Sequence, residues 1–225
     1  QDLTGSVSEA LARRAEQRDT EPQALMGMSP WFGKVVSLAL GEGDNVIGAR
    51  DGASGDGAAG VGDATAGAAA TRAPGLDAVQ VLACPKEDQT LEDCPDWCIP
   101  VDEKTMLEAF WALAAQAECV VTYNGFGFDV PFLVGRSLAL GVEVKVDLLG
   151  NRCKLRPHLD LFDHVRGGGP SSLDVVCFGL GIESPKGAMD GSMVAPAYER
   201  GELLEIAHYN RHDVRATTEL YRKLR

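Results

Sequence analysis

A tyrosine and an aspartate near the end of the chain are spaced so that both side chains share one helical face. They are Tyr209 and Asp213, in the run His208-Tyr209-Asn210-Arg211-His212-Asp213, and residues four apart on a helix lie one above the other. A carboxylate in such a pair can hold a divalent metal ion while the phenol contacts a water bound to that ion. The spacing alone is common, and it is equally typical of a surface helix with a half-buried tyrosine.

A second run upstream carries another aspartate at a strand-to-helix turn. Residues 120–133 read Val-Val-Thr-Tyr-Asn-Gly-Phe-Gly-Phe-Asp-Val-Pro-Phe-Leu. This pattern predicts a buried strand, a tight turn at Asn124 and Gly125, and a helix that opens near Asp129. At such a turn Asp129 could cap the helix N-terminus or bind a metal ion, and the residues alone leave both roles open.

These two runs, in this order, resemble the second and third motifs of the DEDD superfamily of 3′-to-5′ exonucleases, in the variant whose third motif carries a tyrosine. Within that superfamily the chain is similar to stand-alone predicted exonucleases related to the proofreading domain of family B DNA polymerases. The resemblance runs from about residue 101 to the C-terminus and includes the runs at 158–163, 172–174 and 186–192. It implies an α/β, ribonuclease H-like fold, in which helices flank a mixed five-stranded sheet.

The resemblance also implies roles for the matching side chains. Asp129 and Asp213 would be ligands of two Mg²⁺ ions, with Mn²⁺ as an alternative, and two such ions stabilise the attacking and leaving oxygens of phosphodiester hydrolysis. Tyr209 would orient the attacking water or take a proton from it. In the family, the equivalent turn lies beside the end of the nucleic-acid strand that is cleaved. The residues expected to contact substrate are therefore Asn124, Gly125, Phe126 and, at a phosphate, Lys186.

Several neighbouring residues have less specific expectations. Phe128 shares the turn and could contact the last nucleotide, but Phe128 and Phe132 are expected mainly in the core. Asp160 and Asp190 could lie near the site, or they could be turn and capping aspartates.

His208 introduces an alternative, because it lies five residues before Asp213, which is the spacing of the histidine variant of the same superfamily. On a continuous helix, four residues separate Tyr209 from Asp213 by about 40° around the axis, whereas five separate His208 from it by about 140°. No helix-breaking residue lies between Glu202 and Ala207. The tyrosine variant is therefore favoured.

The first motif of the family, an Asp-x-Glu on the first strand, has no clear counterpart at the start of the chain. Gln1-Asp2-Leu3-Thr4 has a threonine where the glutamate would be needed, and no hydrophobic strand precedes it. In the ribonuclease H-like fold this strand is the central one, and its loss would leave two unpaired strand edges. We expect that the sequence starts downstream of the natural first strand; a degenerate, metal-poor relative is the alternative.

Length and charge limit the domain count and the mode of binding. The 225 residues, 45% of them hydrophobic, predict one domain over 1–225. A net charge of −12 is unfavourable for binding phosphates by simple attraction. Basic residues outnumber acidic ones six to four at 136–166 and five to two at 211–225. These clusters could form a track for a nucleic-acid backbone or be ordinary solvated surface.

The remaining pattern gives the order of elements. Strands are expected at 34–40, 78–83, 119–123 and 159–162, and helices at 6–18, 102–117, 130–140, 172–180 and 203–224. Residues 48–75, of which 18 of 28 are glycine or alanine, are expected to form a disordered insertion in a hairpin loop.

Cys84, Cys94 and Cys98 could be free thiols, zinc ligands or a disulfide pair. Gly167-Gly168-Gly169 lacks the lysine and hydroxyl of a loop that binds nucleoside triphosphates.

The predicted function is that of a metal-dependent 3′-to-5′ exonuclease acting on nucleic acid, with single-stranded or frayed DNA as the expected substrate. The sequence does not choose between DNA and RNA. The alternative is a nucleic-acid-binding or scaffold protein that retains the fold without catalysis. No run of 18 apolar residues and no signal segment is present, which favours a cytoplasmic protein without a membrane partner; protein partners stay open.

Overall fold

The fold was established from a computed structural model, which describes residues 34–41, 79–89, 91, 94–150, 152, 154–165, 172–185 and 189–225. The expected helix at 6–18, the insertion at 48–75, Asp2 and Lys186 lie outside these residues.

The described strands form two small sheets. β1 (Ser37–Gly41) pairs antiparallel with β2 (Val79–Ala83), which pairs in parallel with β3 (Cys98–Pro100). β4 (Val120–Thr122) and β5 (His158–Asp160) form a separate parallel pair. The expected mixture of strand directions is present, but the expected single sheet is divided, because β1 and β4 are not paired with each other in the described part of the chain.

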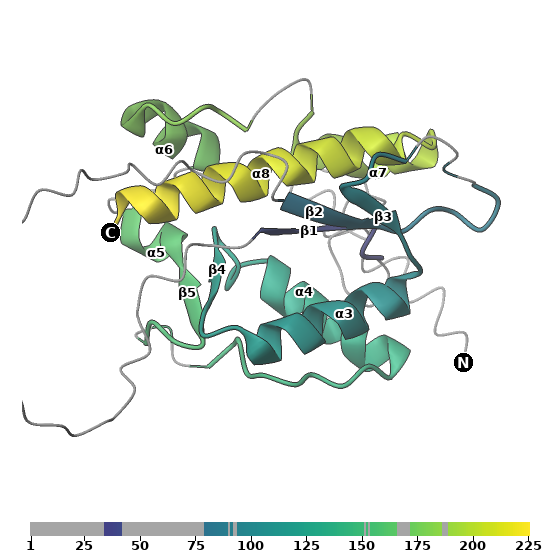
Figure 1. Ribbon diagram of the computed structural model, residues 1–225, viewed down its shortest axis with the longest axis horizontal. Helices are drawn as coiled ribbons and strands as arrows, with labels where there is room; N and C mark the ends of the chain where they lie inside the picture. Colours follow the sequence, from purple (N-terminus) through teal and green to yellow (C-terminus); the bar gives the residue numbers. More distant parts are fainter. Residues whose placement is uncertain are drawn as a thin grey trace, which may run out of the picture.

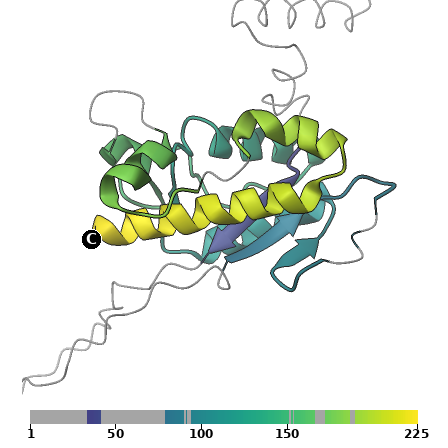
Figure 2. The ribbon, with the colours of Figure 1, turned by 90° about the horizontal axis from the view of Figure 1, so that it is seen from above.

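Helices enclose the strands on two sides (Figure 1). α3 (Glu103–Gln116) and α4 (Asp129–Leu140) lie on one side, and the long α8 (Leu203–Lys223) lies on the other. The shorter elements are α5 (Leu161–Val165), α6 (Leu173–Leu180), the 3₁₀ turn η2 (Gly191–Met193) and α7 (Val194–Glu199). Figure 2 shows α8 crossing over β1 and β2.

Alternation along the strands explains why both sides of the first sheet are covered. Side chains on a strand point to opposite faces in turn. Leu38 and Leu40 of β1 pack with α3 and α4 in the cluster around the fully buried Trp111. Ala39 of β1 and Val81 of β2 pack instead against α8. The sheet is therefore apolar on both faces and needs a helical layer on each side.

α8 spans both sheets. Its first half packs on β1 and β2 through Leu203 and Ala207. Its second half packs beside β4 and β5 through Ala216 and Leu220. Residues of α8 between these two parts still contact the first sheet: the side chain of Asn210 donates to the carbonyl oxygen of Ser37, and that of Arg211 to the carbonyl oxygen of Val79.

Local signals predicted most element boundaries. The Asp102 side chain accepts a backbone N–H at the start of α3, and Gly141 and Gly181 end α4 and α6 with φ of 66° and 64°, as glycine permits. The strand expected at 159–162 is shorter than predicted, because Leu161 and Phe162 belong to α5. β3 and α7 were not predicted.

The cysteines seen in the structure are free thiols. These are Cys84, Cys94, Cys98, Cys119 and Cys177. Cys98 lies buried in β3, and the Cys94 thiol donates to its carbonyl oxygen at 2.9 Å. Burial raises the pKa of the Cys98 thiol to about 12, so this thiol is protonated at neutral pH.

A membrane span would need a long, apolar helix, and none of the described helices meets both conditions.

Candidate active site

Tyr209 and Asp213 meet on one face of α8, as the spacing predicts. The helix is continuous from Leu203, and the Tyr209 hydroxyl is hydrogen-bonded to the Asp213 carboxylate. Burial, and then the charge of Asp213, raise the pKa of Tyr209 above its usual value. The phenol is therefore protonated at neutral pH in the metal-free protein.

Asp129 is the first residue of α4 and does not cap it. The N-cap position belongs to Phe128, and no side chain caps this helix end. The alternative role of Asp129 as an N-cap is therefore wrong. Burial, and then the nearby charge of Asp160, raise the pKa of Asp129 to about 6.

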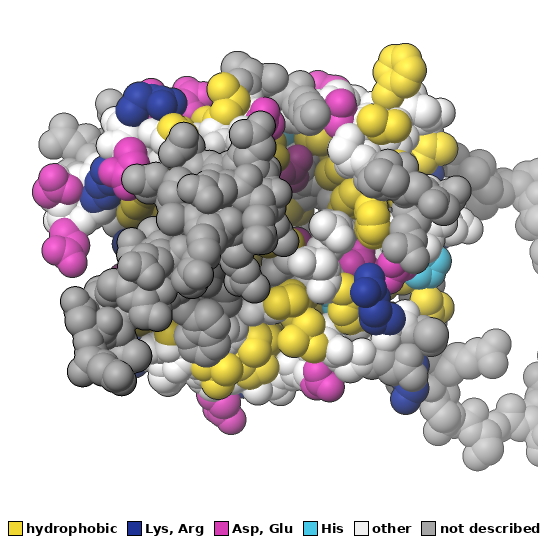
Figure 3. All heavy atoms as spheres, turned by 180° about the vertical axis from the view of Figure 1, so that it is seen from behind, with side chains coloured by type: hydrophobic (Ala, Val, Ile, Leu, Met, Phe, Trp, Pro, Cys, Tyr) yellow, Lys and Arg dark blue, Asp and Glu magenta, His cyan; other side chains and the backbone are white. Residues whose placement is uncertain are grey.

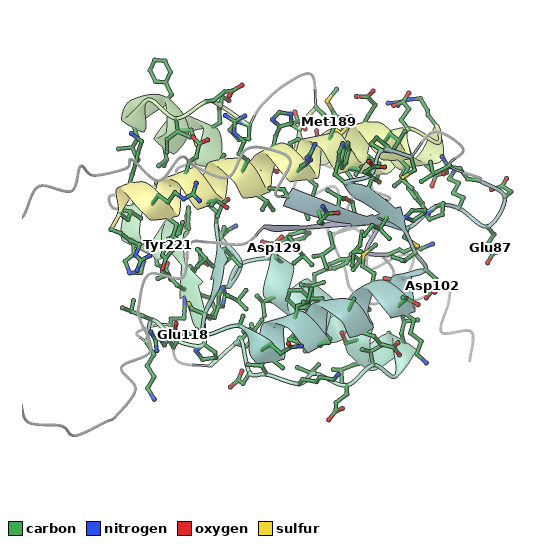
Figure 4. All side chains as sticks on the ribbon, viewed as in Figure 1. Glu87, Asp102, Glu118, Asp129, Met189 and Tyr221 are labelled. Carbon is green, nitrogen blue, oxygen red and sulfur yellow. The ribbon has the colours of Figure 1, made fainter. Side chains whose placement is uncertain are left out.

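Asp129 is nevertheless exposed to solvent, whereas Tyr209 and Asp213 are half-buried. Solvent exposure of Asp129 and a pKa raised by burial agree if solvent reaches the carboxyl from one side while protein surrounds it on the others. Figure 4 shows Asp129 at the start of α4, in the region between β1, β4 and α8. A carboxylate in this setting is accessible to a small ligand and poorly solvated without one.

The two aspartates are electrostatically coupled. Burial raises the pKa of Asp213 to about 6, and the charge of Asp129 contributes to this rise. Like charges held close together favour protonation unless a cation compensates them. Carboxylate oxygens are the donors that Mg²⁺ prefers, so the pair fits such an ion. No group of three or more His, Cys, Asp or Glu side chains suited to a metal ion occurs among the described residues.

The turn before Asp129 is held tightly. Asn124 has a φ of 62°, and its backbone N–H donates to Asp160 at 2.7 Å. The N–H of Phe126 donates to the other oxygen of Asp160 at 2.9 Å. A Cβ on Gly125 would lie 2.2 Å from Oγ1 of Thr122, so only glycine fits at this position. The expected Asn-Gly turn is confirmed, and Gly125 shapes the loop by leaving space.

The aromatic residues at and after the turn lie in three different environments. The centroid of the Phe126 ring lies 4.3 Å from that of His158 and 4.9 Å from Cζ of Arg152. Phe126 therefore packs against other side chains of the protein. Phe128, expected mainly in the core, is 45% exposed beside Asp129, while Phe132 is buried as expected. Phe128 is exposed because it precedes the helix and so lies outside the buried stripe of α4.

Residues near Tyr209 separate into two groups. The His208 ring meets the edge of Trp97 with centroids 4.6 Å apart, consistent with its different position around α8. Asp190 caps η2 by accepting the Ser192 N–H at 2.8 Å, and its charge contributes to the raised pKa of Tyr209. Asp190 is thus both a capping residue and a neighbour of the site.

Some residues of the two basic clusters form ion pairs. At 136–166, Arg136 pairs with Glu103, Arg152 with Asp163, and Arg156 with Glu118. Arg215 of α8 contacts both Glu183 and Glu219. On the face shown in Figure 3, blue side chains lie beside magenta ones. Acidic neighbours therefore compensate part of the positive charge of these clusters.

The sequence holds one Asp-x-Glu downstream of Gln1-Asp2-Leu3-Thr4. Asp19-Thr20-Glu21 has the spacing of the first motif, but the polar Gln17 and Arg18 precede it in place of a hydrophobic strand. It lies outside the residues that the structure describes.

Comparison with known proteins assigns the chain to a family. Residues 97–225 match the family of predicted 3′-5′ exonucleases related to the exonuclease domain of PolB. The match covers more than half of the chain, which therefore belongs to this family. It includes the turn, Asp129, and the Tyr209 and Asp213 pair, and it confirms the resemblance drawn from these residues.

Similar proteins include archaeal DNA polymerases. The chain is 32% identical over 136 residues to the DNA polymerase of Desulfurococcus sp. (strain Tok), covering 52% of this chain and 18% of the polymerase. It is 30% identical over 146 residues to the DNA polymerase of Thermococcus gorgonarius, covering 57% and 19%. The family B DNA polymerase of Pyrobaculum calidifontis superposes with a TM-score of 0.46 at 23% identity, covering 65% and 21%. The chain thus spans about a fifth of the length of the polymerases that it matches.

Proposed function

We propose that this protein is a metal-dependent 3′-to-5′ exonuclease that hydrolyses phosphodiester bonds of nucleic acid, with single-stranded or frayed DNA as its substrate. One observation carries the proposal. Asp129 at the start of α4 and Asp213 on α8 are electrostatically coupled, and Tyr209 is hydrogen-bonded to Asp213. The family to which the chain belongs is one of predicted 3′-5′ exonucleases, and this arrangement suits that reaction.

The two aspartates would hold Mg²⁺, or Mn²⁺ in its place. Each carboxyl has its pKa raised to about 6, so at neutral pH the ionised pair is unfavourable until a cation compensates it. When bound, a pair of divalent ions supplies an activated water and stabilises charge on the attacking and leaving oxygens. The protein contributes the oxygen ligands and a poorly solvated setting for the negative charge.

Tyr209 would position the attacking water. Its phenol is protonated at neutral pH because its pKa is raised, and its hydroxyl is fixed by Asp213. A hydroxyl that donates its single proton to Asp213 can accept a hydrogen bond from a water molecule at the site. Tyr209 would orient the attacking water or take a proton from it.

The remaining ligands would come from a strand between β1 and β4. These strands belong to separate sheets, and α8 packs on both sheets. A strand paired with β1 and β4 would join β2, β1, β4 and β5 into the mixed sheet of a ribonuclease H-like fold, and an Asp-x-Glu on it would lie beside the two aspartates.

A second candidate is a nucleic-acid-binding protein without catalysis. The small number of metal ligands favours this non-catalytic alternative. The described residues supply two coupled carboxylates and no group of three metal-ligating side chains. The two candidates differ in whether nucleic acid is shortened or only bound.

The deciding experiment uses the full-length natural protein and a 5′-labelled single-stranded oligonucleotide. With Mg²⁺ we expect a ladder that shortens one nucleotide at a time from the 3′ end, and a chemically blocked 3′ end should resist. Asp213→Asn should not cleave, whereas Glu205→Gln, which removes an exposed negative charge from the same helix, should cleave as the wild type does. Binding without shortening under Mg²⁺ or Mn²⁺ would favour the non-catalytic alternative.

A further inference from the structure

Asp160 is a buried carboxylate whose hydrogen bonds reach the backbone of the loop before Asp129. Its residue surface is 3% exposed. One oxygen accepts the N–H of Asn124 at 2.7 Å and that of Phe162 at 3.1 Å. The other accepts the N–H of Phe126 at 2.9 Å. Three backbone donors from two segments therefore converge on one side chain.

The position of Asp160 explains why the loop needs a side-chain acceptor. β4 and β5 pair in register up to Thr122 and Asp160. Beyond Thr122 the strand pairing ends, and the next N–H groups are satisfied by the Asp160 carboxylate in place of a neighbouring strand. An ionised carboxylate offers acceptors at both oxygens, and hydrogen bonds to a charged acceptor are stronger than neutral ones.

A second contact of β5 supports the same loop. The His158 ring bridges Oγ1 of Thr122 and the carbonyl oxygen of Leu148, each at 2.8 Å. Burial lowers the pKa of His158, so the ring is neutral and bridges as one donor and one acceptor. Gly125 packs against Thr122 without space for a Cβ. The loop is thus confined from β5 by two side chains, and Asp160 is the one that contacts its backbone.

We propose that Asp160 is a positioning residue, which holds residues 123–128 so that Asp129 lies beside Asp213. The expected effect on turnover rests on the proposed function. The role of Asp160 in holding the loop does not depend on that function. Asp160 acts through backbone hydrogen bonds and binds neither substrate nor metal in this account.

The test compares Asp160→Asn with the wild type in the full-length protein. The amide keeps the size but replaces one acceptor oxygen by a donor, so at least one loop N–H loses its partner. Amide hydrogen exchange at Asn124 and Phe126 should accelerate about 10- to 100-fold, because hydrogen bonds to a charged acceptor are lost. The turnover number of the nuclease should fall by at least about tenfold, with the KM for the oligonucleotide nearly unchanged.

Met106→Ala is the matched control. Met106 is fully buried in α3, so its truncation destabilises the protein at a distance from the loop. In this variant exchange should accelerate throughout the fold without preference for Asn124 and Phe126, and turnover below the melting temperature should stay close to that of the wild type.

Each outcome decides a different point. Unchanged exchange at Asn124 and Phe126 in Asp160→Asn would overturn the proposal. Accelerated exchange with wild-type turnover would overturn the positioning role and leave the proposed function intact. A wild-type protein that does not shorten the oligonucleotide would overturn the proposed function, and the exchange data would then decide alone whether Asp160 holds the loop.

Discussion

Replacing Asp213 by asparagine should stabilise the metal-free protein at neutral pH while removing its activity. Burial, and then the charge of Asp129, raise the folded pKa of Asp213 from 3.8 to about 6. Between these values the folded protein holds a proton that the unfolded chain releases, so stability falls as pH rises. Above pH 6 the full penalty of the ionised carboxylate is present, and an amide at the same position avoids it.

The magnitude follows from the size of the shift. A change of about two pKa units corresponds to ~3 kcal/mol as an upper bound. Partial exposure of Asp213 screens its charge, and loss of the charged partner of the Tyr209 hydroxyl costs ~1 kcal/mol. We therefore expect Asp213→Asn to be about 1 kcal/mol more stable than the wild type at pH 8 in a metal chelator. The advantage should shrink toward zero as pH falls to 4.

Urea denaturation at pH 4 to 8 measures this difference. Adding Mg²⁺ at pH 8 should stabilise the wild type and leave Asp213→Asn unaffected, because a ligand that binds only the folded state adds to its stability. A difference between the two proteins that is the same at pH 4 and pH 8 would refute the reasoning, since it would show that the Asp213 charge is not strained in the folded state.

Three further predictions concern other parts of the molecule. Tyr209→Phe should lower turnover by ~10²-fold in the full-length protein, while His208→Ala should be much milder; the reverse order in a nuclease assay would favour the histidine variant. Glu103→Gln should cost about 3 kcal/mol in chemical denaturation, because it breaks a buried ion pair with Arg136, and a loss below about 1 kcal/mol would show that the pair is dispensable. Replacing residues 48–75 by a short turn should change the stability by about 1 kcal/mol or less, and failure to fold would show that the segment packs.

The parts of the fold that local signals define were predictable from the sequence. Asp102, Gly141 and Gly181 mark helix ends because capping depends on residues adjacent in the chain. The pairing of Tyr209 with Asp213 was predictable because helical geometry fixes residues four apart. These features need no knowledge of tertiary structure.

The parts that depend on distant residues were not predictable. β3 has three residues and ends in a proline, and it is a strand because β2 lies beside it. Leu161 and Phe162 extend an apolar run, which cannot distinguish a strand from the short helix that they form. The division into two sheets depends on which segment pairs with β1 and β4.

The candidate site shows the same limit. Asp129 and Asp213 were found because each lies in a recognisable run. The role of Asp160 could not be found in the same way. Its three backbone donors come within hydrogen-bonding distance only because β4 pairs with β5 in this register. The ion pair of Arg152 with Asp163 likewise depends on folding, and a count of basic residues does not reveal it.

The most direct measurement is the position of a bound metal ion. Crystals of the full-length protein soaked in Mn²⁺ should show an anomalous peak within ~2.0–2.3 Å of carboxylate oxygens of both Asp129 and Asp213, and Asp213→Asn should lose it. An active enzyme whose Mn²⁺ lies elsewhere, or whose peak persists unchanged in Asp213→Asn, would contradict the account.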